Sequence, residues 1–362
     1  MARESLLNED WARTIAQLGG AEALSATARE TKAFLRAREI KSATDLLRLT
    51  LAYCLGEGGL RSTAAWAASV GVADISNVAL LQRLRRCGDW FATLVGRMVA
   101  ARPPAAGTGR LIRIVDATVV PKAGGGRGEL WRIHSAFDLP QERFSHFELT
   151  DEHGGETLDR IPPVAGEIRI GDRAYLQPKR MAWLLKAGAD FVIRASWKNA
   201  RWLGADGSPL DLIQELSAAG SDLVDRPILI GCKGGEPLAL RLVALKKPSD
   251  AAAKARRKAR FDAHRKGRTL SKETLAAADW VILVTSLERQ EFRAEDVLAL
   301  YRLRWRIELA FKRLKSLVGL RAPPGSDERS AKPYVLAHLL MILLLEPLVD
   351  VLDDSPHWAE AA

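Results

Sequence analysis

Three acidic residues in this sequence have the types and surroundings needed to hold divalent metal ions. Asp116 and Asp172 each lie near the end of a strand-like run, and Glu308 lies in a helical segment rich in cations. Mg²⁺ prefers hard oxygen ligands and takes few of them from protein, since phosphate and water supply the rest. Two such ions about 4 Å apart can activate an attacking oxygen and stabilise the leaving oxygen of a phosphodiester. If the carboxylates converge, we expect metal-assisted cleavage of phosphodiester bonds.

The segment around Glu308 carries further groups at helical spacing. A single helix is predicted from about residue 294 to 317, and one stripe of it, within roughly a 60° arc, would hold an aromatic hydroxyl, two cations and a carboxylate: Tyr301, Arg304, Glu308 and Lys315. The cations would bind phosphates and offset their charge. The simpler interpretation is a solvated face on which Arg304 pairs with Glu308. Each aspartate, taken alone, is also compatible with a cap at a strand end.

The elements that must position these residues follow a mixed pattern. Residues 1–100 look helical, and 62–86 reads as two helices around a tight turn with Ser76 as an N-cap, as in a helix-turn-helix motif. A helix is predicted at 178–187, and strand-like runs occur at 111–120, 129–139, 143–151, 166–175, 190–196 and 280–286. This order predicts an α/β fold, in which a mixed sheet carries helices on its faces.

Changes of composition divide the chain into five parts. The clearest boundary is the Pro/Gly/Ala-rich segment 101–110. We predict an N-terminal helical DNA-binding domain, a first part of a catalytic core, a β-rich basic insertion, a second part of the core with the Glu308 helix, and a C-terminal helical tail: 1–105, 106–196, 197–279, 280–335 and 336–362.

The positive charge of the chain is concentrated in one block. The net charge is +10, and Lys246 to Lys272 holds eleven Lys or Arg against two Asp. A local block of this kind indicates a surface that binds a polyanion, with nucleic acid the first candidate. Within it, Arg256, Arg257 and Lys258 form the densest run. A solvated helix or loop is the simpler interpretation of a charge run by itself.

Other chemistries lack their signatures. The sequence has no Walker motif, no GxSxG and no Cys/His pairing, and its six His are scattered. Cys54, Cys87 and Cys232 are far apart and fit a reducing compartment. The polar, acidic N-terminus is no signal peptide, and the longest apolar run, 334–345, is too short to span a bilayer. We therefore expect a cytoplasmic protein with no membrane partner.

At these residues the sequence resembles the DDE transposases of bacterial insertion sequences. It is most similar to insertion sequence family four, whose signature Tyr-x2-Arg-x3-Glu-x6-Lys is complete here as Tyr301, Arg304, Glu308 and Lys315. The second aspartate lies in a matching G-D-R-x-Y motif with Arg173 and Tyr175, and Asp116 lies in VDAT. The three motifs occur in the family's order over about residues 106 to 330.

The resemblance implies a fold, a reaction and partners. The fold is an RNase H-like core interrupted by a β-rich insertion, and Asp116, Asp172 and Glu308 hold two Mg²⁺ ions, with Mn²⁺ also suitable. The reaction is cut-and-paste transposition through a hairpin, on the element's terminal inverted repeats and target DNA. A homodimer associated with the nucleoid carries it out. Trp280 and Trp305 match the tryptophans near the flipped base of the hairpin, and core packing is the alternative for both.

Two other classes of function remain open from the sequence. The first is a non-catalytic, domesticated DNA-binding protein that uses the 62–86 hairpin and the basic block. The second is an RNase H-like nuclease that cuts DNA without joining it. Metal-dependent cleavage separates the first from a transposase, and hairpin or strand-transfer products separate the second.

Overall fold

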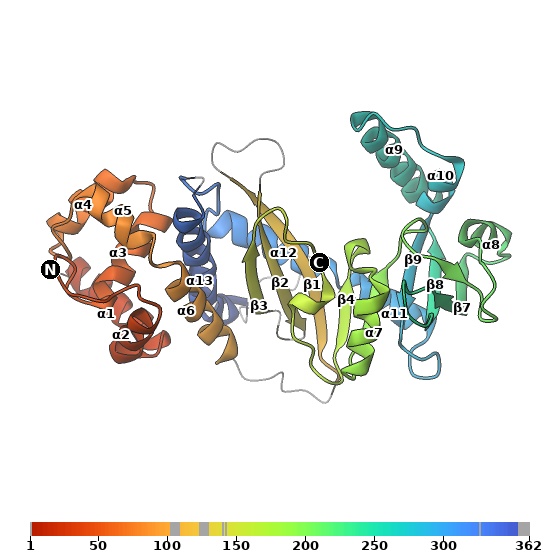
Figure 1. Cartoon of the computed structure of the whole chain (residues 1–362), viewed down its shortest axis with the longest axis horizontal. Coiled ribbons are helices and arrows are strands. Elements are labelled where there is room, and N and C mark those ends of the chain that lie inside the picture. The colour runs from red at the N-terminus through yellow and green to blue at the C-terminus, as the bar shows by residue number, and fades with distance from the viewer. Residues whose placement is uncertain are drawn as a thin grey trace.

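The computed structural model describes most of the chain and contains one continuous mixed sheet of nine strands. The described residues are 2–101, 109–122, 130–139, 141, 143–325 and 327–353. The boundary segment predicted at 101–110 therefore lies largely outside them. Helices of the N-terminal third gather beyond one edge of the sheet, and two helices from residues 249–278 stand off near the opposite edge (Figure 1).

The first hundred residues are helical, as predicted. They form α1 (Ala2–Gln17), α2 (Gly20–Glu30), α3 (Ala43–Leu55), α4 (Leu60–Ser69), α5 (Asn77–Leu84) and α6 (Gly88–Ala100). Helices α4 and α5 make the expected hairpin. The Ser76 hydroxyl caps α5 by accepting from the Ala79 N–H at 3.2 Å, and Leu80 and Leu84 bury its inner face.

The last described helix, α13 (Glu328–Asp353), joins this N-terminal bundle. It packs on α6 and α3, and its Val335, Leu339 and Leu340 are buried in the same core as the N-terminal helices. The apolar run at 334–345 thus belongs to a packed helix, as predicted. The boundary placed between residues 335 and 336 falls inside this one helix.

The strands extend across the predicted core and insertion alike. They are β1 (Ile112–Pro121), β2 (Leu130–Leu139), β3 (Arg143–Thr150), β4 (Ile168–Gly171), β5 (Asp190–Arg194), β6 (Trp202–Leu203), β7 (Leu223–Ile230), β8 (Leu238–Lys246) and β9 (Trp280–Thr285). Their order is β3-β2-β1-β4-β5-β9-β8-β7-β6, parallel only between β1, β4 and β5. The mixed α/β class is confirmed. Strands of the predicted insertion, 197–279, continue the sheet through β9 and do not form a separate sheet.

Helices cover both faces of this sheet. The remaining elements are η1 (Leu158–Arg160), η2 (Arg173–Tyr175), α7 (Pro178–Lys186), α8 (Leu212–Ala218), α9 (Ser249–Arg265), α10 (Lys272–Ala278), α11 (Ala294–Arg302) and α12 (Trp305–Leu317). Ile114 of β1 is buried with Ile307 of α12, whereas Val115 is buried with Met181 of α7. Because side chains alternate along a strand, Asp116 shares the α12 face with Ile114.

The single long helix predicted over residues 294–317 is wrong, because the chain divides there into α11 and α12. The N–H groups of Leu303, Arg304 and Arg306 donate to carbonyls three residues back, which tightens the backbone into a turn. Val297 of α11 is buried against β5, β8 and β9, whereas Ile307 of α12 is buried against β1 to β3. Since the sheet twists, one straight helix does not follow both parts of it.

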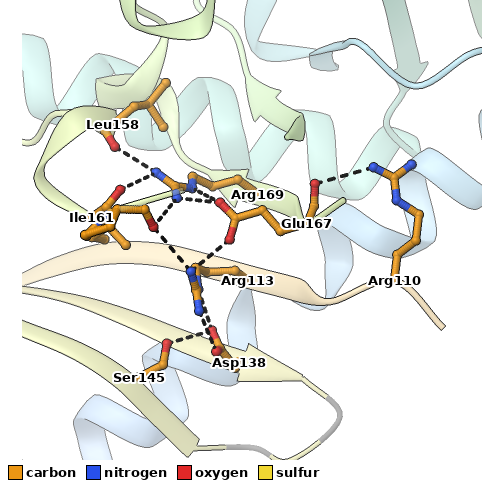
Figure 2. A network of polar contacts seen from close by, with 9 residues as sticks. Arg110, Arg113, Asp138, Ser145, Leu158, Ile161, Glu167 and Arg169 are labelled. Carbon is orange, nitrogen blue, oxygen red and sulfur yellow. Dashed lines mark hydrogen bonds and ion pairs between the residues drawn. The ribbon is translucent and has the colours of Figure 1, made fainter. Parts of the chain in front are cut away.

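A buried charge network joins β1, β2 and β4 (Figure 2). Arg113 and Arg169 are partners in the parallel register of β1 and β4, and the fully buried Glu167 accepts from both, from Arg113 at 2.8 Å. Arg113 also forks onto Asp138 of β2 at 2.7 and 2.8 Å, and Arg169 donates to carbonyls of the 158–162 segment. The network fixes the register of the two strands that lead to the aspartates.

Candidate active site

Asp116 lies in β1, and Asp172 directly follows the neighbouring parallel strand β4. β1 pairs with β4 so that Ile114 lies opposite Ile170. Continuing this register by two residues brings Asp116 beside Asp172, and adjacent strands are about 4.8 Å apart. Asp172 follows the end of β4 and precedes η2 as its N-cap residue. The fold thus brings together two carboxylates that are 56 positions apart in the sequence.

Helix α12 brings Glu308 to the same face of the sheet. Glu308 and Asp116 line one cavity of about 570 Å³ together with Thr118 and Lys312. Arg304, in the turn before α12, links the two carboxylates. Its Nη2 donates to Glu308 Oε1 at 2.6 Å, and its Nη1 is 3.7 Å from Asp116 Oδ2. The Arg304–Glu308 pair considered from the sequence is present, and it forms part of the site.

Tyr301 and Arg194 contact the second aspartate. The Tyr301 hydroxyl donates to Asp172 Oδ1 at 3.4 Å, and Arg194 Nη1 of β5 is 3.9 Å from the same oxygen. Burial raises the pKa of Tyr301 and the Asp172 charge raises it further, so the phenol stays a donor. The sequence analysis missed Arg194, although it ends the strand that neighbours β4. Arg173, in η2, is exposed beside this group.

Glu156 adds a carboxylate that the sequence analysis did not single out. Burial raises the pKa of Asp116 to about 6; the Ala117 N–H and Arg304 oppose this rise, and Glu156 and Asp172 add to it. Burial likewise raises the pKa of Glu156, with a contribution from Asp172. No sequence motif marks Glu156, which lies in the connection between β3 and β4. Burial, with smaller contributions from neighbouring acids, therefore disfavours the charged forms of Asp116 and Glu156.

The carboxylates fit a divalent cation in chemistry. Asp116 and Asp172 offer oxygen ligands and are partly accessible, with side chains 19% and 35% exposed. Within the described parts of the chain, no three acidic, histidine or cysteine side chains are grouped so that they could hold one ion. Glu308, whose side chain is 57% exposed, pairs with Arg304 through its Oε1 atom.

The predicted tryptophans have different environments. Trp305 begins α12 and is 49% exposed, with the Arg306 guanidinium 5.3 Å from its ring centre. Trp280 begins β9 opposite Lys246 and is only 8% exposed in the core. The Trp305 ring is therefore accessible to a ligand, and the Trp280 ring packs in the interior. Lys315 belongs to α12, but its side chain lies outside the described residues.

The basic block, Lys246 to Lys272, runs from the end of β8 through α9 to the first residue of α10. Arg256 is half-buried and pairs with Asp279, so it helps to attach α9 to the sheet. Arg257 and Lys258 are exposed. The predicted trio therefore divides into one residue with a structural partner and two that face solvent.

The fold and site define a class of protein. The site combines an aspartate on one strand, an aspartate directly after the adjacent strand, a glutamate from a helix on the same face and arginines near all three. These groups are suited to metal-dependent cleavage of phosphodiesters. A model of the transposase DDE domain matches residues 107–344. The chain is 39% identical over 360 residues to the transposase of insertion sequence element IS421 from Escherichia coli, with 96% of each chain covered. It is also 39% identical over 357 residues, again 96% of each chain, to transposase InsL of element IS186A from Escherichia coli strain K12.

The chain belongs to the DDE transposase family. It is an enzyme of DNA strand cleavage and transfer, and the family's DDE domain implies dependence on a divalent metal ion. None of the described helices is long and apolar enough to cross a membrane.

Proposed function

We propose that this protein moves an insertion sequence by cut-and-paste transposition with a hairpin intermediate. The observation that carries the proposal is the proximity of Asp116 and Asp172, each two residues beyond the paired Ile114 and Ile170, with Arg304 joining Asp116 to Glu308. The order β3-β2-β1-β4-β5 supports an RNase H-like core within the sheet. The signature Tyr301, Arg304, Glu308 and Lys315 supports membership of insertion sequence family four.

The three carboxylates would hold two Mg²⁺ or Mn²⁺ ions. Ions held there would supply activation of the attacking oxygen and stabilisation of the leaving oxygen. Arg194 and the exposed Arg173 lie around Asp172, where they are placed to bind the phosphates that flank the reacting one. Tyr301 holds the Asp172 carboxylate through its hydroxyl.

The accessible ring of Trp305 is suited to stack on a base displaced from the duplex. Lys315 would bind a neighbouring phosphate. The Trp280 side chain is only 8% exposed, so its ring would have to leave the core before it could stack on that base.

The DNA partners would be the terminal inverted repeats and the target. The N-terminal bundle offers a second contact surface, because a cavity of about 770 Å³ beside α5 is lined by four arginines and two acids: Arg36, Arg38, Arg83, Arg86, Glu39 and Asp74. Arginines of this kind would contact phosphates and so position the duplex. The exposed face of the α4–α5 hairpin would then contact the DNA. A homodimer would hold the two ends together, in the bacterial cytoplasm and associated with the nucleoid.

Cleavage of labelled DNA tests the proposal. The substrate is a duplex that carries the DNA flanking this gene, incubated with full-length protein and Mg²⁺. Cuts at the element's end followed by a hairpin and by joining to target DNA are expected. Nicks without a hairpin or joining would indicate a nuclease. Specific binding with no cut in Mg²⁺ or Mn²⁺ would indicate a DNA-binding protein on a transposase scaffold.

Neutralising the exposed part of the basic block should weaken DNA binding. Arg257→Gln with Lys258→Gln removes two cations from the α9 surface. Each lost phosphate contact should reduce the slope of log affinity against log salt concentration by about one. The measurement is affinity for the end duplex across a salt series. Arg256→Gln is the comparison, because its loss also frees Asp279 and should lower thermal stability. An unchanged salt slope in the double variant would place this surface off the DNA path.

Arg304→Gln should affect metal binding and cleavage in opposite directions. The change frees Glu308 and removes a positive charge near Asp116, so Mn²⁺ should bind the DNA-free protein more tightly. The gain is at most about fivefold, because the pair is partly exposed and water screens it. Cleavage should nevertheless fall by at least about tenfold, since a charged hydrogen bond to phosphate contributes about 1.5–3 kcal/mol. Calorimetry measures the affinity for Mn²⁺, and the cleavage assay measures the rate. If neither the affinity nor the rate changed, Arg304 would have no role in metal binding or in cleavage.

A further inference from the structure

The outer face of α9 has an exposed phenylalanine in its C-terminal half. Phe261 is 66% exposed, the highest fraction among the large hydrophobic side chains of the described residues. The opposite side of the helix is the attached one: Ala252 is buried, Arg256 pairs with Asp279, and Ala259 and Ala263 are half-buried. At about 100° per residue, Phe261 points away from that side.

Cations lie on both sides of this ring. Lys254, Arg257, Lys258 and Arg265 are all exposed and fall within about 60° of Phe261 around the helix axis. Lys254 and Arg265 have only long contacts to acids, at 4.0 Å to Asp250 and 3.7 Å to Asp262. Figure 1 shows α9 and α10 standing off the sheet, so this face is open to a large partner.

The geometry points to double-stranded DNA as the partner, with α9 lying in the major groove and Phe261 touching thymine methyl groups. This inference rests on the proposed function and names the part of the chain that contacts the bases. An α-helix is about 10–12 Å wide, which matches the major groove at about 12 Å and exceeds the minor groove at about 6 Å. The thymine methyl is the apolar group that the major groove presents to a phenylalanine. The flanking cations would reach the phosphates on either side.

A second copy of the chain fits this surface less well. Pairing two α9 faces across a two-fold axis would bring their cations together, and like charges oppose such an interface. An isolated exposed phenylalanine needs no explanation by itself. Phe261 lies between cations that face the same way. This arrangement favours a partner that presents an apolar group between two rows of negative charge.

Replacement of thymine by deoxyuridine tests the contact, because it removes only the methyl group. The probe is the end duplex with each thymine replaced in turn, bound by full-length protein that carries Asp116→Asn to prevent cutting. At one or a few positions the replacement should weaken binding about threefold to fivefold, which corresponds to one buried methyl. In Phe261→Ala the same replacements should have no effect. Phe261→Met keeps an apolar group and should retain the sensitivity.

Salt dependence separates the ring from its neighbours. Phe261→Ala should weaken binding without changing the salt slope, whereas Lys258→Gln should lower both. Equal sensitivity to deoxyuridine in Phe261→Ala and the Asp116→Asn parent would overturn the inference. So would a change of sedimentation in Phe261→Ala without DNA, which would identify a protein partner instead. If the unmodified protein cuts DNA but Phe261→Ala does not change the response to deoxyuridine, only the α9 contact is contradicted. If the unmodified protein never cuts DNA, the proposed function is contradicted.

Discussion

Asp116→Asn, Asp172→Asn and Glu308→Gln are each expected to reduce strand cleavage by at least about a thousandfold. Each change removes the charge of one carboxylate that would hold a metal ion, and such an ion contributes several kcal/mol to the stability of the transition state. DNA binding should persist, because the arginines and lysines around the site remain. Binding to Asp116→Asn should be at least as tight as to the unmodified protein, since a negative charge beside the phosphates is lost.

The measurement compares cleavage and affinity on the same end duplex. Glu295→Gln is the matched control, because Glu295 is an exposed acid on α11, outside the group of carboxylates. It should cut DNA like the unmodified protein. Parallel loss of binding and cleavage in all three variants would mean that the carboxylates maintain the fold and do not act in the reaction. Normal cleavage by Glu308→Gln would remove Glu308 from the set and direct attention to Glu156.

The largest effect on stability is expected from the buried network of Figure 2. Glu167→Gln removes a fully buried charge that Arg113 and Arg169 both contact, leaving two guanidinium groups without their shared counter-ion. Breaking a buried pair on one side costs about 3–5 kcal/mol, because the remaining charge stays desolvated. Asp138 still neutralises Arg113, so Arg169 bears most of this cost.

Urea denaturation measures the change in unfolding free energy. Glu167→Leu combined with Arg169→Met removes both charges, and it should cost less than the sum of the two single changes. Arg293→Gln at the exposed Arg293–Asp296 pair should leave the denaturation midpoint unchanged, since water screens that pair. Additive effects of the two buried changes would show that Glu167 and Arg169 do not act as one unit. Cleavage should fall with stability in Glu167→Gln, because β1 contains Asp116 and β4 leads directly into Asp172.

Local patterns in the sequence determined many of the elements and led to the prediction of Asp116, Asp172 and Glu308 as site residues. Strand alternation, the Ser76 cap and the helical N-terminus depend on neighbours in the chain, and so these elements appeared near their predicted places. The order of the motifs around Asp116, Asp172 and Glu308 likewise does not depend on packing. The turn at Leu303–Arg304 was missed because the apolar spacing continues through it, and only the twist of the sheet makes α11 and α12 separate.

The tertiary structure alone decided which groups share the site and in what state. Arg194 and Glu156 carry no motif, and they meet the aspartates because β5 and the β3–β4 connection end at the same place. The burial of Trp280 follows from the addition of β8 to β9, a long-range pairing that its own sequence does not encode. Charge and residue type are local properties, whereas burial and the distance between carboxylates arise only when distant segments pack together.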